Sequence, residues 1–145
     1  MIDKETIVER PFTAAAFQAY LNEGQLMGSR SRRTGEVFAP PRPIDPHTGR
    51  DDMEWVELSG RGTLAAFTSV YIGTSAMIAA GYDRSKPYVA GIVELEGGPR
   101  ISAQLLGVDG KQPDIAWIGR PLQASFIERG EGDTRRAYLA FEMIP

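Results

Sequence analysis

Four polar residues occupy two short loops with the spacing of paired metal ligands. Ser31 and Thr34 are separated by two residues, as are Asp45 and Thr48, and each pair is followed by a glycine. A four-cysteine zinc site uses paired thiolates at this spacing, because four sulfur atoms must close a tetrahedron around the metal. The 145-residue chain has no cysteine, so none of the four positions supplies a soft sulfur ligand. We therefore expect both loops to fold without zinc and to bind no metal.

The same four side chains can stabilise the loops in another way. Serine, threonine and aspartate commonly accept hydrogen bonds from nearby backbone amides in turns. Coordination of a metal by Asp45 and His47 is the rival interpretation, but two ligands in one loop rarely form a structural site. A segment as small as residues 28–58 has little core of its own. Without zinc it must gain order from the neighbouring domain, from side-chain hydrogen bonds or from a partner.

A local excess of arginine surrounds these loops. Residues 25–50 carry five arginines against two carboxylates, a net charge of +3, whereas the whole chain carries −3. Guanidinium groups match the geometry of phosphate oxygens, so one interpretation is a site for an anionic ligand such as the phosphates of coenzyme A. A solvated loop face is the other interpretation. The candidate ligand-binding residues are Arg32, Arg33 and Arg42 in this segment and Arg84, Lys86 and Tyr88 further along the chain.

The remaining residues do not indicate catalytic chemistry. A hydrolytic triad needs a base, and the only histidine, His47, lies in a loop rich in proline and glycine. Without cysteine the chain cannot carry out a thiolase-type acyl transfer by itself. The segment Gly60-Arg61-Gly62 lacks the length and the lysine of a phosphate-binding loop. We therefore expect no catalytic residue, and a protein that is not an enzyme.

Two apolar stretches are candidates for contact with a partner. Residues 72–86 link two predicted strands and contain the run AMIAA, in which Met77 and Ile78 are the expected anchors. The predicted N-terminal helix places Phe17 and Tyr20 on one face. Each stretch has an alternative within the chain itself. The loop could fold over the mouth of a barrel, and the helix could pack on its own domain.

The elements that position these residues change along the chain from a helical to a strand pattern. Residues 12–21 have helical spacing, with Thr13 as the N-cap and Gly24 as the stop signal. Four prolines between 40 and 46 exclude a regular helix or central strand there. Strands are expected at 62–72, 87–95, 100–106, 122–128 and 137–143. Five strands, with a gap between the third and the fourth, are consistent with a small Greek-key barrel.

Composition limits the broad class of the protein. Apolar residues make up 42% of the chain, which is enough for a packed core. The absence of cysteine gives no sign of an oxidising compartment. The N-terminal residues MIDKETIVERPF lack the apolar segment of a signal peptide, and no apolar run approaches about 18 residues. We expect a soluble cytoplasmic protein with no membrane partner.

Short motifs along the chain resemble those of a known family. Its members read CxxCG…PPRPxCPxCG and then W-V-E-x-S-G-x-G, and this chain has PPRP at 40–43 and WVELSGRGT at 55–63. These are two-domain proteins made of a rubredoxin-like zinc ribbon followed by an OB-fold, formerly a domain of unknown function. The resemblance covers essentially the whole chain, but all four cysteines that would bind zinc are replaced.

The resemblance implies a mainly β fold in three parts. These are an N-terminal helical segment (1–27), a degenerate, zinc-free ribbon (28–58) and a five-stranded OB-fold barrel (59–145). Members are commonly encoded with, or fused to, thiolase-like, ketoacyl-synthase-like and hydroxymethylglutaryl-CoA-synthase-like enzymes. The resemblance therefore implies a non-catalytic accessory subunit that docks on a thiolase-like enzyme in a hetero-oligomer. It would help to bind acyl-CoA and carry no cofactor of its own.

Two other functions remain open from the sequence. The first is a stand-alone acyl-CoA-binding protein. The second is an OB-fold that binds single-stranded nucleic acid, which usually needs a basic groove lined with aromatic residues. Acidic and basic residues balance in 59–145, and the aromatic residues there mostly fall at core-like strand positions. We therefore expect no nucleic-acid partner.

Overall fold

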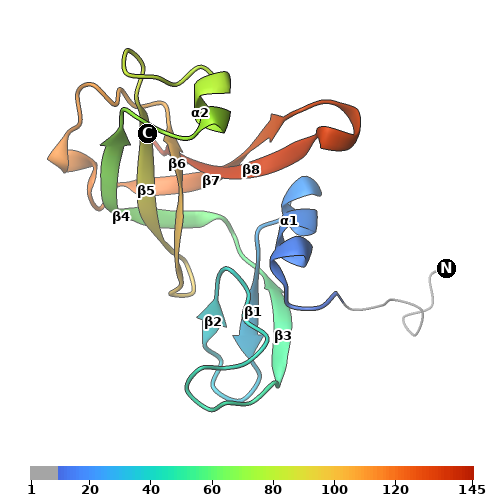
Figure 1. Ribbon diagram of the computed structural model, residues 1–145. Coiled ribbons are helices and arrows are strands. Elements are labelled where there is room, and N and C mark those ends of the chain that lie inside the picture. The colour runs from blue at the N-terminus through green and yellow to red at the C-terminus, as the bar shows by residue number, and fades with distance from the viewer. Residues whose placement is uncertain (1–9) are drawn as a thin grey trace.

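The computed structural model describes residues 10–145, which form a three-stranded sheet and a closed five-stranded barrel (Figure 1). The elements in chain order are α1 (Ala14–Asn22), β1 (Met27–Ser31), β2 (Val37–Phe38), β3 (Met53–Glu57), β4 (Arg61–Val70), α2 (Ser75–Ala79), β5 (Tyr88–Leu95), β6 (Arg100–Leu106), η2 (Ile115–Trp117), β7 (Pro121–Arg129), η3 (Gly132–Thr134) and β8 (Arg136–Met143). This confirms the predicted mainly β fold with an N-terminal helix and a five-stranded OB-fold barrel. Within 10–145, no helix is long and apolar enough to cross a membrane.

Helix α1 begins and ends where local sequence signals place its ends. The hydroxyl of Thr13 accepts a hydrogen bond from the backbone N–H of Ala16, which satisfies one of the free donors of the first turn. At the other end Gly24 has a φ of 79°. Its N–H bonds to the carbonyl of Leu21, and the next N–H bonds to that of Tyr20, which is the Schellman arrangement. The predicted N-cap and stop signal are therefore confirmed, and the helix is shifted by one to two residues.

The first sheet and its loops form a projection that we call the finger, residues 27–57. Strand β1 lies in the centre, antiparallel to β2 on one side and to β3 on the other. The loops after β1 and β2 hang from the far end of this sheet (Figure 1). Residues 39–52, which include the prolines, form no helix or strand. The finger is thus a small sheet that carries long irregular loops at its tip.

The barrel has the strand order β4-β5-β6-β8-β7 and closes because β4 also pairs with β7. All pairs are antiparallel except β6 with β8. The ten-residue β4 reaches both neighbours, and its register with β5 shifts between Leu64 and Ala66, which marks a β-bulge. A bulge increases strand bending, and a bent first strand allows a five-stranded barrel to close.

Two glycines are required where the finger joins the barrel. Gly60 has a φ of 78°, in the left-handed region that other residues rarely adopt. A Cβ on Gly62 would lie 2.5 Å from the carbonyl oxygen of Glu94 on β5. The Gly60-Arg61-Gly62 segment therefore serves the close approach of β4 to its neighbours, in agreement with the sequence argument against a phosphate-binding loop.

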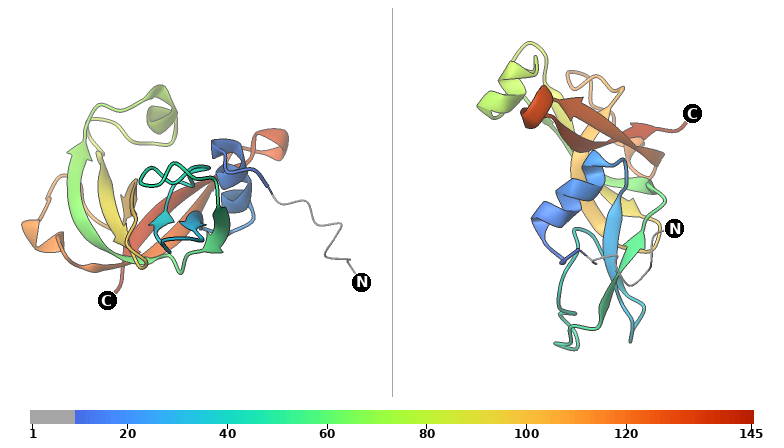
Figure 2. Two further views of the ribbon diagram at one scale, coloured as in Figure 1. Left: turned by 90° about the horizontal axis from the view of Figure 1, so that it is seen from below. Right: turned by 90° about the vertical axis from the view of Figure 1, so that its right-hand side faces the viewer.

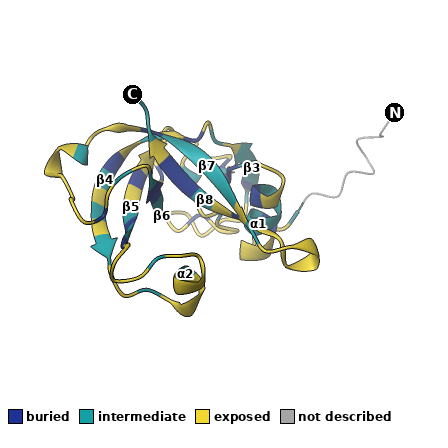
Figure 3. Ribbon diagram, turned by 90° about the horizontal axis from the view of Figure 1, so that it is seen from above, coloured by how far each residue is buried: buried dark blue, intermediate teal, exposed yellow. Residues whose placement is uncertain are grey.

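One continuous hydrophobic core runs through the barrel and reaches the base of the finger. Figure 3 shows buried positions along the barrel strands. Its buried members are Leu21, Leu26, Ala39, Leu64, Val89, Val93, Leu95, Ile101, Leu105, Leu122, Ala137 and Phe141. The first three come from α1 and the finger region and the others from the barrel. Trp117 of η2 also packs against this core and lies 4.9 Å from the ring of Phe67, so residues 114–119 cover one end of the barrel.

Side chains of α1 occupy an open edge of β8. Strand β8 pairs with β6 only over Ala140–Glu142, so its earlier residues have no strand on that side. Gln18 donates to the carbonyl of Ala137 at 2.7 Å, and Asn22 accepts the N–H of the same residue at 2.9 Å. Helix α1 therefore lies against both β8 and β1 (Figure 2), and it packs on its own chain. Our division of the chain at 27/28 and 58/59 remains a prediction.

Candidate functional site

The two loops at the tip of the finger have matching hydrogen-bond patterns. The side chain of Ser31 accepts a hydrogen bond from the N–H of Thr34, three residues further on, at 3.1 Å. The side chain of Asp45 accepts one from the N–H of His47, two residues further on, at 2.8 Å. Thr34 and Thr48 do the same with the N–H groups two residues further on. In addition, the carbonyls of Ser31 and Asp45 accept the N–H of the glycine that ends each loop. All four positions with metal-ligand spacing therefore bind backbone amides.

Asp45 is the charged group at the centre of this arrangement. Its side chain is fully buried, as is that of Ser31. The hydrogen bond from the His47 N–H lowers the pKa of the Asp45 carboxyl group below its usual value, although burial acts in the opposite direction. The Ser31 side chain and the Thr48 N–H lower this pKa further. Among described residues the Oδ2 atom has no hydrogen bond of ordinary geometry. The finger tip thus buries a carboxylate that its surroundings keep ionised.

The rival metal interpretation has no matching geometry in residues 10–145. The His47 ring is exposed, and its Nε2 atom lies 3.3 Å from the carboxylate of Glu36, which belongs to the other loop of the finger tip. No group of three or more histidine, aspartate and glutamate side chains in the described residues is arranged to hold a metal ion. Asp45 instead directs one carboxyl oxygen to the backbone of its own loop.

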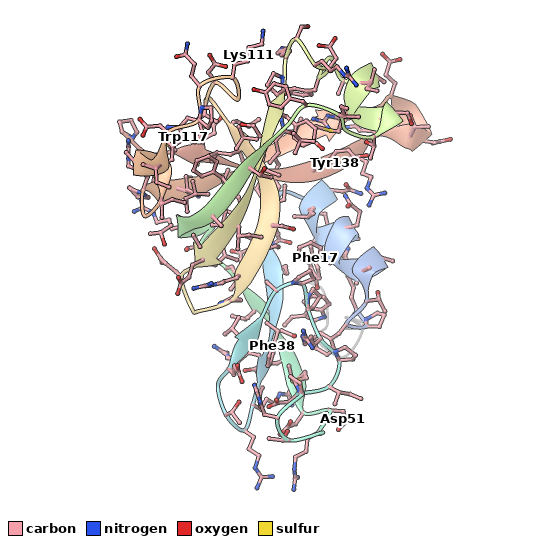
Figure 4. The ribbon with its side chains drawn as sticks, turned by 60° about the vertical axis from the view of Figure 1, so that its left-hand side comes forward. Phe17, Phe38, Asp51, Lys111, Trp117 and Tyr138 are labelled. Carbon is pink, nitrogen blue, oxygen red and sulfur yellow. The ribbon has the colours of Figure 1, made fainter. Side chains whose placement is uncertain are left out.

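The six predicted ligand-binding residues fall into two sets at opposite ends of the molecule. Arg32, Arg33 and Arg42 belong to the finger loops, whereas Arg84, Lys86 and Tyr88 follow α2 on the barrel (Figure 4, in which Asp51 and Lys111 mark the two ends). Arg32 lies 3.6 Å from Glu54, and the Arg42 guanidinium lies 5.7 Å from the centre of the Phe38 ring. The structure does not bring the two sets together, because the barrel separates the finger from the β4–β5 connection. Which set, if either, binds a ligand remains a prediction.

Two residues of the second set, Lys86 and Tyr88, border a hollow of about 330 Å³ at the barrel end, whereas Arg84 is not part of its lining. Lys86 and Tyr88 line it from β5 and its approach, and Lys111 from the loop after β6. The Lys86 ammonium lies 5.3 Å from the centre of the Tyr82 ring, and the rings of Tyr82 and Tyr88 meet edge to face at 5.7 Å. Two ammonium groups against one carboxylate, that of Asp109, leave a positive charge at this hollow, which favours an anionic ligand.

The predicted docking residues differ in how much of them is exposed. Phe17 packs against the core, and the ring of Tyr20 meets that of Trp55 edge to face, with 4.9 Å between ring centres. These two residues of α1 therefore make contacts within their own chain. Ile78 is 56% exposed on α2, whereas Met77 is half-buried and its sulfur accepts a hydrogen bond from Arg129. Of the four, Ile78 is the most available to a partner.

Sequence reasoning missed two residues on the hairpin of β7 and β8. Tyr138 is 40% exposed, although its strand position is core-like, and the guanidinium of Arg129 lies 5.1 Å from its ring centre. Tyr71 is also exposed, so these two aromatic residues depart from the expected core pattern. The alternation of side chains along β8 is the only sequence signal that could have placed Tyr138 on the other face of the strand from the buried Ala137. The choice of which face is buried depends on the barrel.

Comparisons with known proteins agree with this architecture. Residues 55–126 match the family model described as ChsH2, C-terminal OB-fold domain. A DUF35 domain-containing scaffold protein of Methanocaldococcus jannaschii is 34% identical over 70% of this chain and 67% of its own length. The benzoylsuccinyl-CoA thiolase subunit BbsA of Thauera aromatica is 33% identical over 59% of this chain and 54% of its own length. The solved structure titled Ltp2-ChsH2(DUF35) aldolase has the same fold, with a TM-score of 0.71 at 23% identity over 94% of this chain and 96% of that one.

Proposed function

This chain belongs to the DUF35 family, and from that membership we propose that it is a non-catalytic accessory subunit that docks on a thiolase-like enzyme. The observation that carries the proposal is its similarity to two kinds of relative, one named a scaffold protein and one named a subunit of a thiolase. The chain has no cysteine, so a thiol nucleophile for acyl transfer has to come from the partner enzyme. The role left to this chain is assembly.

The proposal includes a share in holding acyl-CoA. The hollow bordered by Lys86, Tyr88 and Lys111 supports it, because two ammonium groups beside aromatic rings suit a phosphorylated ligand with a planar base. The arginines of the finger loops are the second candidate set. Since the two sets lie far apart, a single coenzyme A molecule on this chain uses one of them, and the partner supplies the rest of the site.

We also propose that the finger is a zinc ribbon that has lost its metal. The support is the pair of matching loops in which Ser31 and Asp45 occupy two of the four ligand positions. The Ser31 oxygen accepts the Thr34 N–H, so the hydroxyl proton of Ser31 is available to the Asp45 carboxylate, whose pKa the Ser31 side chain lowers. That contact would connect the two loops, as a metal ion connects them in a ribbon with four cysteines.

Affinity purification from the source cells tests the assembly role. The tagged full-length chain is isolated under mild conditions, its bound proteins are identified by mass spectrometry, and the complex is sized. We expect a thiolase-like subunit in fixed stoichiometry and thiolase-type activity only in the complex. Turnover of acyl-CoA by the purified chain alone, or a sized complex without a thiolase-like subunit, would refute the proposal.

Two measurements on the isolated chain separate the alternatives. Titration calorimetry with coenzyme A and an acyl-CoA tests the stand-alone function, which requires micromolar affinity without a partner. Metal analysis of the purified chain tests the zinc-free finger, for which we expect far less than one zinc per chain. Stoichiometric zinc after dialysis against a chelator would overturn that part of the proposal.

A further inference from the structure

Strand β6 lacks a neighbouring strand within residues 10–145 along half of one side. It pairs with β5 over residues 100–105, whereas its pairing with β8 is limited to Gln104, Leu105 and Leu106. Residues 100–103 therefore form an edge of the sheet that no described strand covers, which we call the open edge. At about 3.3 Å per residue the open edge is roughly 13 Å long.

The hairpin that joins β5 to β6 determines which backbone groups of the open edge point outward. The N–H of Leu95 bonds to the carbonyl of Pro99 at 2.8 Å, so these two residues form a hydrogen-bonded pair. In an antiparallel ladder such pairs alternate with pairs whose backbone groups point away from each other. The register therefore bonds Ile101 and Ala103 to β5 and directs the N–H and carbonyl of Ser102 away from it.

Helix α1 takes the place of β6 beside the first half of β8. If the parallel register of the two strands continued, the Ser102 N–H would bond to the carbonyl of Ala137. That carbonyl accepts a hydrogen bond from Gln18 instead, and the Ala137 N–H bonds to Asn22. The edge of β8 is thus occupied by α1. Ser102 is exposed, and no hydrogen bond from elsewhere in 10–145 reaches its backbone groups.

A second hollow, of about 480 Å³, lies along the open edge between β6, β8 and α1. Its apolar lining comes from four elements and includes Phe17, Leu21, Ile92, Ile101 and Leu139. Arg100 is the one charged residue of this lining, and it pairs with Glu94 at 3.5 Å. The second hollow therefore suits uncharged aliphatic groups better than phosphates.

We propose that the open edge binds an extended segment of the partner enzyme as an additional strand. The segment's backbone bonds to the N–H and carbonyl of Ser102, and its aliphatic side chains enter the second hollow. Addition of a strand to a sheet edge is a general mode of peptide recognition, in which main-chain bonds give affinity and side-chain pockets give specificity. The inference rests on the proposed function, because it names how the partner enzyme is held.

The surroundings of the open edge favour a partner segment over a second copy of this chain. In a second copy the same edge faces that copy's own α1 and β8, so the edges of two copies cannot lie side by side while both helices keep their contacts. A stable dimer usually buries at least about 1,200 Å² in total, and an edge of four residues provides far less. The open edge therefore suits one part of a larger interface, such as that between an enzyme and its accessory subunit.

Hydrogen exchange of the ¹⁵N-labelled full-length chain tests whether the edge is open. We expect the Ser102 N–H to exchange at least about tenfold faster than those of Ile101 and Ala103, which bond to β5. Equal protection of the three amides would mean that the edge is already occupied within the chain, and it would overturn the inference.

An NMR titration of the same chain tests strand binding. The probes are the peptide acetyl-Thr-Val-Thr-Val-Thr-amide, its version with both valines N-methylated, and octanoyl-CoA. We expect only the unmodified peptide to shift the Ser102 amide and to slow its exchange. Ser102→Pro removes the outward N–H and no bond to β5, so the affinity should fall about tenfold or more. The matched control Ser102→Ala keeps the N–H and should keep the affinity.

A second pair of variants tests the second hollow, and thermal unfolding shows whether each variant is folded. Ile92→Asp places a charge in the hollow and should weaken peptide binding, whereas Ile115→Asp changes an isoleucine that is 81% exposed elsewhere and should not. The inference is overturned if the unmodified peptide shifts no amide of the open edge. It is also overturned if the N-methylated peptide or octanoyl-CoA shifts these amides equally.

The complex separates this inference from the proposed function. If a thiolase-like subunit binds the chain and Ser102→Pro leaves the Kd unchanged, the inference fails and the proposed function stands. If the peptide binds the open edge but purification yields no thiolase-like subunit, the proposed function fails and strand binding stands. Concentration-dependent dimerisation that Ser102→Pro abolishes would assign the open edge to a second copy and overturn the inference.

Discussion

The barrel and the finger are stabilised by different kinds of buried side chain. The largest fully buried side chains of the barrel are Phe141, Leu64, Leu122, Val89 and Val93, whereas those of the finger are Asp45, Ser29 and Ser31. The barrel therefore depends on the removal of apolar surface from water, which is non-directional. The finger depends on directional bonds, including one from the Arg42 N–H to Ser29 at 2.7 Å. A module too small for an apolar core can thus be ordered by short polar side chains that bind the backbone.

Removal of the largest core side chain should give the largest effect. Phe141→Ala in β8 leaves a cavity in the centre of the barrel, and we expect the free energy of unfolding to fall by about 3–5 kcal/mol. Chemical denaturation followed by far-ultraviolet circular dichroism measures this loss. The comparison predicts that the finger unfolds with the barrel in this variant, because both share one core. A change below about 1 kcal/mol would contradict an apolar barrel.

The polar contacts of α1 with β8 should give a smaller but still global effect. The double variant Q18A/N22A leaves the buried N–H and carbonyl of Ala137 without partners, so we expect a loss of about 1–3 kcal/mol. The variant Q18A/E23A is a control, since Glu23 pairs with exposed Arg10 instead of the strand. Denaturation curves of the two variants provide the measurement. Equal stabilities would show that the Asn22 bond contributes nothing.

Loss of the buried carboxylate should affect the finger and leave the barrel folded. In Asp45→Ala the His47 N–H loses its acceptor, and we expect its hydrogen exchange to accelerate roughly tenfold or more. Barrel amides such as that of Val93 should exchange at the rate of the wild type. Asp51→Ala is the matched control, because that aspartate is exposed on the same loop. If the hydrogen exchange of barrel amides accelerates together with that of finger amides, the two regions are not stabilised separately.

Acid should open the finger before the barrel. The pKa of Asp45 is lowered in the folded chain, mainly by the His47 N–H, so its contribution to stability is present above its unfolded pKa. It is lost as the pH falls below about 4 and through the lower folded pKa. Glu23 and Asp83 have pKa values shifted in the same direction, by Arg10 and Ser85 respectively. NMR spectra between pH 6 and 2 should therefore show finger amides changing in the wild type, and Asp45→Asn should lack this step.

The sequence was sufficient for features that depend on near neighbours. The cap at Thr13, the stop at Gly24 and the hydrogen bonds of Ser31, Thr34, Asp45 and Thr48 all join residues no more than five apart. Short polar side chains have few geometric choices over that distance, so the residue type predicts the bond. The predicted ends of the five barrel strands agree with the structure to within two residues for the same reason, since alternation is a local property.

Features that depend on the closed barrel could not be predicted. The finger arginines lie at the other end of the molecule from Arg84 and Lys86, because β4 runs the length of the barrel between them. The register that places Arg129 beside Arg136 depends on the length of the turn between β7 and β8. The sequence separates these two residues by only seven positions, yet it does not show which strand face they share or that α2 lies beside them.

The contact of Gln18 and Asn22 with Ala137 has a consequence for solubility in a crowded cell. A strand that lacks a neighbour along part of its length exposes free N–H and carbonyl groups, with which a strand of another chain can pair. Here two side chains of one helical turn bind both the N–H and the carbonyl of Ala137. Helix α1 thus prevents another chain from pairing with this edge of β8, whether or not a binding partner is present.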